Sequence, residues 1–271
     1  MPVPLHWHTE PLLIGLLVGF GWLYALLLWP LRGKLAVDGR VKRYQPICYY
    51  TGLVTVYLAV GSPLDQLGED FLFSAHMVQH MLLIYLAPPL LLFGLPGWLA
   101  DALLKNNHVR KVWRVLTHPV FAGLLFTFLY TVWHIPVAYE LALQEKWAHV
   151  LEHWMMFVPA VLMWWPILSP SLLVPPISYG MRMLYVFLLM IGQLPVFGFL
   201  TLSETVLYPT YEFAPRIFEL TPLQDQILGG LIMKVTNMVV SLLIFGISFY
   251  KWWEMDRAAE ARPKETLAFG R

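Results

Sequence analysis

Two histidine pairs have the residue type and the spacing that metal binding requires. His76 and His80 are four residues apart, and His149 and His153 repeat that spacing. Side chains four residues apart lie on one face of a helix, so each pair can direct both imidazoles at one partner. Imidazole is a good ligand for zinc, copper, iron and nickel. The two pairs, together with His134, therefore predict a metal site.

Other side chains close to these histidines are candidates for the surroundings of the same site. Met77 and Met81 follow the two histidines of the first pair and would add thioether ligands that favour Cu(I), with ordinary packing as the alternative role. Asp65 and Glu152 are candidate carboxylates that would fix an imidazole tautomer. Asp225 begins the last apolar segment and is expected in the same layer as the histidines.

The composition indicates what kind of chain must position these residues. Of the 271 residues, 58% are hydrophobic and 13% are charged, whereas about a quarter are charged in a soluble domain. The chain is therefore predicted to be an all-α protein that crosses a membrane several times. Its single cysteine, Cys48, excludes an intrachain disulfide and a Cys-x-x-Cys metal motif. The first apolar segment has no basic N-terminal flank, so we expect it to be retained as a membrane span.

Seven apolar segments are long enough to cross a bilayer, which takes about 20 helical residues. They cover residues 11–31, 46–61, 71–94, 119–138, 147–168, 180–202 and 224–250. Fifteen of the eighteen Lys and Arg residues fall on one side of these spans, and only Lys146 and Arg216 fall on the other. Basic loops stay cytoplasmic, so the N-terminus is predicted outside and the C-terminus inside. Residues 1–253 would form the membrane domain and residues 254–271 a polar cytoplasmic tail.

This orientation places the five histidines in the outer half of the membrane. With a helical rise of about 1.5 Å per residue, His76 and His80 lie about 7 Å and 13 Å below the outer end of their span. The same rise places His134, His149 and His153 within about 9 Å of the outer end. Unpaired polar groups in hydrocarbon are costly, so a shared functional site is expected in this layer.

Four further features carry separate predictions. The connection 96–118 is amphipathic, which suits an interfacial helix, although an ordinary loop is equally compatible. The outer loop 203–222 contains Tyr208 and Tyr211 and is expected to cap the outer face. Pro136 is expected to splay the outer end of the fourth span. Lys234 lies inside the last span, where a cation needs a partner or a cavity.

Taken in combination, the motifs resemble a known family. The chain contains Ser62-Pro-Leu-Asp65, His76-Met-Val-Gln-His80-Met, Ala87-Pro-Pro-Leu, Gly94-Leu-Pro, Trp133-His134-x-Pro136, His149-x-x-x-His153, Trp164-Trp165, and Asp225-Gln226 followed by Gly229-Gly230. This set is similar to that of the CtaG-type cytochrome c oxidase assembly factors of bacteria. The resemblance implies a multi-pass inner-membrane protein that is needed for an active haem-copper oxidase and acts in copper delivery.

The leading expectation is therefore a metallochaperone with no catalytic activity. Copper, as Cu(I) or Cu(II), would be held by the five histidines near the outer face and passed to an oxidase subunit, with the lipid bilayer and no nucleic acid as the other partner. A haem-binding electron-transfer or haem-sensing protein is the first alternative, because paired histidines from neighbouring helices can also supply axial ligands. An intramembrane zinc hydrolase, with Glu152 or Asp65 assisting a zinc-bound water, is the second, although the His-Glu-x-x-His arrangement is missing.

Overall fold

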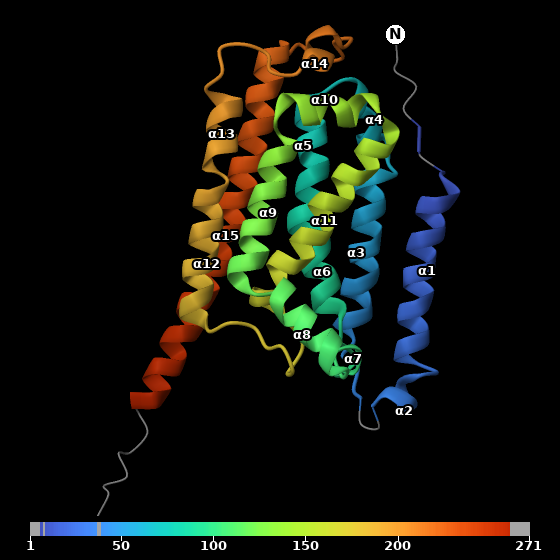
Figure 1. Ribbon diagram of the computed structural model, residues 1–271, viewed down its shortest axis with the longest axis vertical. Coiled ribbons are helices and arrows are strands. Elements are labelled where there is room, and N and C mark those ends of the chain that lie inside the picture. The colour runs from blue at the N-terminus through green and yellow to red at the C-terminus, as the bar shows by residue number, and fades with distance from the viewer. Residues whose placement is uncertain (1–5, 8, 37–38, 261–271) are drawn as a thin grey trace, which may run out of the picture.

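The computed structural model describes residues 6–7, 9–36 and 39–260, which form a bundle of helices (Figure 1). Within these ranges every regular element is a helix. Six helical segments are long and apolar enough to cross a membrane, and a bent pair of helices raises the number to seven. The prediction of an all-α, polytopic membrane protein is confirmed.

The crossing segments are built from one helix or from two or three consecutive ones. In chain order they are α1 (Pro11–Leu28), α3 (Tyr44–Val60) with α4 (Pro63–Asp70), α5 (Phe73–Met81) with the π-helix η1 (Leu82–Leu86) and α6 (Ala87–Gly94), α8 (Asn107–Leu116) with α9 (Pro119–Trp133), α11 (Lys146–Leu168), α12 (Tyr179–Gly192) with α13 (Leu194–Thr201), and α15 (Pro222–Glu260). The connecting helices are α2 (Arg32–Leu35), α7 (Gly97–Leu103), α10 (Pro136–Gln144) and α14 (Pro209–Phe213).

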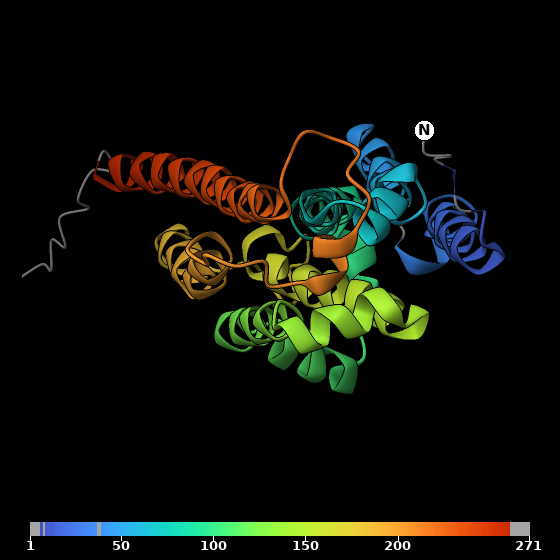
Figure 2. The same cartoon turned by 90° about the horizontal axis from the view of Figure 1, so that it is seen from above.

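The short helices gather at the two ends of the bundle. Figure 1 shows α4, α10 and α14 at the end where the chain begins, and α2, α7 and α8 at the opposite end. The second end carries the basic residues of α2 and α8, so the positive-inside rule assigns it to the cytoplasm. We call the other end the outer end. Seen from above, α1 and α15 stand on opposite sides of the bundle (Figure 2).

The fourth crossing differs from its predicted bounds of 119–138. α9 ends at Trp133, and Pro136 lies in the first turn of the separate helix α10. Proline is favoured there because a first-turn N–H has no helical partner. Pro136 therefore starts a new helix, and the expectation that it splays the fourth span is wrong. At the other end, α8 joins α9 with a bend of 57°, so the amphipathic connection 96–118 is helical.

Two of the sequence motifs meet where α6 contacts α11. Pro88 has no N–H, so the Ile84 carbonyl four residues earlier cannot make its helical hydrogen bond. The indole of Trp164 on α11 donates to this carbonyl over 2.8 Å from Nε1 to O. The hydrogen bond ties η1, just before α6, to α11 and satisfies a backbone group that hydrocarbon could not satisfy.

α15 fixes the N-terminal end of α5, the helix that carries the first histidine pair. The Asp225 carboxylate accepts hydrogen bonds from the Phe73 amide (2.7 Å), the Ser74 amide (3.3 Å) and the Ser74 hydroxyl. First-turn amides have no partner within their own helix, so Asp225 caps α5 from a different helix. One turn further on, Gly229 lies so close to α5 that a Cβ atom there would overlap the Phe73 ring.

Candidate metal centre

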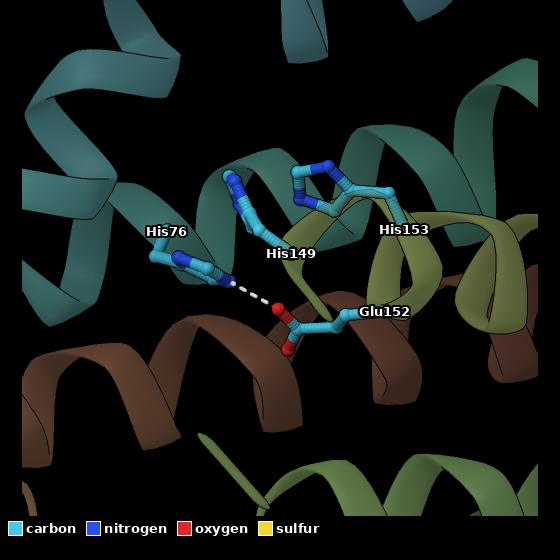
Figure 3. A group of neighbouring side chains, drawn as sticks. All are labelled: His76, His149, Glu152 and His153. Atoms are coloured by element: carbon cyan, nitrogen blue, oxygen red, sulfur yellow. Dashed lines mark ion pairs between the residues drawn. The ribbon is translucent and has the colours of Figure 1, made fainter. Parts of the chain in front are cut away.

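Three helical segments bring the predicted histidines together near the outer end. α5 supplies His76 and His80, the residue after α9 is His134, and α11 supplies His149 and His153. Figure 3 shows His76, His149 and His153 together with Glu152. All of them are buried except His153, which is half-buried. With Glu152 of α11, these five histidines are called the histidine cluster below.

Four members of the histidine cluster are close enough to share one ion. One ligand atom from each of His76, His149, Glu152 and His153 lies within 4.8 Å of the other three. The ring centroids of His76 and His149 are 5.7 Å apart, and those of His149 and His153 are 4.2 Å apart. Metal bonds to imidazole and carboxylate measure about 2.0–2.2 Å for zinc, so small side-chain rotations would place all four around one ion.

The sequence predicted Glu152 as a partner that orients an imidazole from outside the metal site. Its carboxylate instead lies among the four possible ligands. Its oxygens are 3.7 Å from His76 Nε2 and 3.6 Å from His80 Nε2, and those two nitrogens are 2.9 Å apart. Neither Glu152 oxygen has a hydrogen-bond partner within the described part of the chain. A carboxylate in such a place is stabilised when a positive charge lies beside it.

Several imidazole nitrogens of the histidine cluster are also buried without hydrogen-bond partners among the described residues. They are Nδ1 of His76 and His80 and Nε2 of His134, His149 and His153. Buried polar atoms are normally paired, so this concentration needs an explanation. Coordination of a metal supplies one, because it uses the nitrogen lone pairs.

In two of these histidines, the other ring nitrogen, Nδ1, has a partner that orients the imidazole. His134 Nδ1 lies 2.6 Å from the Tyr130 carbonyl, and His149 Nδ1 pairs with Glu69. A partner on one imidazole nitrogen fixes the tautomer and leaves the other nitrogen to bind a metal. His134 sits at the edge of the group, with its ring centroid 6.1 Å from that of His80.

The remaining predicted residues lie around the cluster. Met77 faces α15, where its Cγ would be 3.1 Å from a Cβ added to Gly229, and Met81 belongs to the apolar core, so both positions suit packing. Asp225 caps α5 and acts on the cluster through that helix. Asp65 accepts a hydrogen bond from Gln79 and lies with Glu69 and His149 in a second group of donors.

Three buried tyrosines cover the outer side of the histidine cluster. Tyr208 donates to the His134 carbonyl (2.8 Å) and Tyr211 to the Gly68 carbonyl (2.6 Å), so the loop 203–222 contributes to the cap that the sequence predicted. The Tyr139 ring lies 5.1 Å from that of His76. Tyr139 was not predicted because the predicted fourth span ended at residue 138 and the helix α10 was not expected.

Two other residues near the site were missed or left without a role. Glu69 follows Asp65 by four residues, a helical spacing that points to a shared face only if the connection between the second and third spans is helical, as α4 is. Lys234 lies close to an aromatic ring, because its Nζ is 6.0 Å from the centroid of the Phe197 ring. That distance is at the limit of a cation–π interaction.

Comparison with known proteins gives one result that bears on this geometry. The family model described as cytochrome c oxidase caa3 assembly factor (Caa3_CtaG) matches residues 22–255. The matched range contains every residue of the histidine cluster. No curated protein and no solved structure matched the chain.

Proposed function

The chain belongs to the cytochrome c oxidase caa3 assembly factor family, and from this premise we propose that it carries copper for the oxidase. Copper binds in the histidine cluster and is passed to an oxidase subunit in a bacterial cell membrane. The role is that of a metallochaperone, which binds and releases its cargo without a catalytic step. The tail 254–271 is assigned to the cytoplasm, and of it residues 261–271 lie outside the described ones.

The observation that carries this proposal is the set of buried polar atoms without partners. Five imidazole nitrogens and both oxygens of Glu152 share this state at one place in the bundle. Imidazole and carboxylate together suit a divalent copper ion, and imidazole alone also serves Cu(I). The carboxylate would offset part of the positive charge of the ion, which lowers the cost of holding that ion inside a membrane protein.

The depth of the cluster fits delivery to an oxidase. The buried copper of a haem-copper oxidase lies within the membrane toward the outer face. The histidine cluster lies near the outer end of this bundle, so copper could pass between the two proteins without crossing the membrane core. Transfer then requires only that ligands of the client replace ligands of the cluster one after another.

Copper content and oxidase assembly test the proposal together. We expect the purified double variant His76→Ala/His80→Ala to lose tight copper binding, and membranes that contain it to hold oxidase deficient in copper. His118→Ala is the matched control, because His118 is exposed and precedes α9 at the cytoplasmic end. Retention of tight copper binding by the double variant, or full oxidase activity in its membranes, would contradict the proposal.

The same preparation separates copper from haem. The Nε2 atoms of His76 and His80 are 2.9 Å apart, whereas axial nitrogens on opposite sides of one iron would be about 4 Å apart, twice a metal–nitrogen bond of about 2 Å. This pair is therefore too close to hold one haem iron between its imidazoles. A strong Soret band in the purified protein would overturn the choice of copper.

A further inference from the structure

A second group of possible metal ligands lies between the histidine cluster and the outer surface. It consists of Asp65 and Glu69 on α4 and His149 on α11, whose ligand atoms lie within 4.8 Å of one another. The Ser62 hydroxyl accepts a hydrogen bond from the Leu64 amide and caps the start of α4. The four-residue spacing then places both carboxylates on the face of α4 that meets α11.

Exposure differs among the residues of the two groups. The Glu69 side chain is 33% exposed, whereas Asp65 is 7% exposed. In the histidine cluster His76, His80 and Glu152 are 0% exposed, and His153 is half-buried. On α4, an ion arriving at the outer end would therefore meet Glu69 before Asp65.

His149 belongs to both groups. Its Nδ1 pairs with Glu69, and its ring lies beside those of His76 and His153 (Figure 3). The residue is 6% exposed, and its Nε2 has no partner among the described residues. This imidazole can therefore be a ligand in either group, through Nδ1 beside the carboxylates or through Nε2.

We propose that Asp65, Glu69 and His149 form a loading site for a divalent transition-metal ion. Two carboxylates and one imidazole suit Zn(II) or Cu(II) and lack the sulfur ligands that select Cu(I). The ion enters at Glu69 and is held there with His149 Nδ1. It then passes to His149 Nε2, the bond to Nδ1 breaks, and His76, His153 and Glu152 replace the carboxylates of α4. Only metal–ligand bonds change, and the oxidation state of the ion is constant. The destination of the ion rests on the proposed function, whereas the loading site does not.

Removal of the histidine cluster isolates the loading site. In the full-length variant His76→Ala/His80→Ala/Glu152→Gln, we expect the tight copper binding to be lost and one weakly bound Cu(II) per chain to remain, seen by electron paramagnetic resonance with Cu(II) in excess. Addition of Glu69→Gln should weaken this binding by at least about tenfold. Removal of a group that only hydrogen-bonds a metal ligand already lowers metal affinity by about that factor. Glu212→Gln changes an exposed carboxylate of α14 and should leave the binding unchanged. If the triple variant binds no Cu(II), the inference is overturned.

Loading kinetics test the same inference with the cluster intact and do not depend on the folding of the triple variant. Asp65→Asn and Glu69→Gln should each slow the uptake of Cu(II) by at least about tenfold while the final copper content stays at the wild-type value. Wild-type uptake rates in both variants would overturn the loading site. If wild-type protein binds a single Cu(II) that depends on Glu69 but not on His76, the loading site stands and the proposed function fails.

Discussion

Among the single residues, Glu152 has the environment that most needs a cation. Its carboxylate is fully buried, lies 3.7 and 3.6 Å from two imidazole nitrogens and has no hydrogen-bond partner among the described residues. A structural pair of histidines would not require a carboxylate in that position. Helical spacing explains why it is there, because Glu152 follows His149 by three residues and shares its face.

If His76 and His153 bind one ion, their substitutions should not be additive. We expect His76→Ala and His153→Ala each to abolish most copper binding, and the double variant to lose little more, because ligands of one ion act as a unit. Isothermal titration of the purified variants measures this. Partial losses that add up would show that the two residues serve separate sites.

Acid should release the copper. Only a neutral imidazole binds a metal, so protons compete with copper and affinity should fall as the pH drops through about 6.5, the ordinary imidazole pKa. A thioether does not titrate in this range, so His80→Met should shift the acid midpoint or flatten the curve. Copper retention measured from pH 8 to pH 5 checks both. A curve for His80→Met identical to that of the wild type would remove His80 from the ligand set.

Between helices, the close contact of α15 with α5 sets the position of the first histidine pair. A Cβ at Gly229 would overlap the Phe73 ring, whereas no other described element places an atom within 4 Å of a Cβ added at Gly246 on the same helix. We expect Gly229→Ala to destabilise the protein by about 1–3 kcal/mol through overpacking. Gly246→Ala should be neutral or stabilising by up to about 1 kcal/mol, because alanine favours the helix.

Thermal unfolding of the two glycine variants in detergent measures the difference. Copper affinity provides a second readout, because a displaced α5 should weaken the histidine cluster in Gly229→Ala and leave it intact in Gly246→Ala. Equal stability of the two variants would show that the contact between α15 and α5 is loose.

The sequence predicted individual helices better than their interruptions. The 3.6-residue period placed His76 and His80 on one face correctly, because that relation depends only on local geometry. The π-helix after Met81 and the break at Pro136 were not predicted. The π-helix is accompanied by a contact between helices, the bond from Trp164 to the Ile84 carbonyl, which no local pattern contains. The break before Pro136 has a local signal, the preference of proline for the first turn of a helix, which the span lengths alone did not use.

For the molecule as a whole, the positive-inside rule and the structure agree that the two ends of the described chain lie on opposite sides of the membrane. The described chain begins at the end that holds α4, α10 and α14 and finishes at the opposite one (Figure 1). A reporter fused after Arg271 should therefore be cytoplasmic, and one inserted in the loop 203–222 should be external. The opposite result would place the histidine cluster in the inner half of the membrane and contradict delivery at the outer face.

The shared depth of the histidines could be predicted because it follows from span positions and a constant rise per residue. The identity of their neighbours could not be predicted in this way. Depth does not say that Glu152 lies beside both His76 and His80, or that Tyr139 and Tyr208 lie next to the same site. Those relations arise when α5, α10 and α11 pack together, and a single sequence does not fix the rotation of one helix against another.

The π-helix Leu82–Leu86 has a consequence for how this chain tolerates a change of length. A π turn accommodates one residue more than an α turn, and each residue turns an α-helix by about 100°. Below it, Leu91 and Gly94 of α6 fit closely against Gly52 and Tyr49 of α3. Deleting one residue here would restore an α-helix and rotate α6 by about 100° relative to α5. The shortened chain could keep its contact with α3 or its histidine pair in place, but not both.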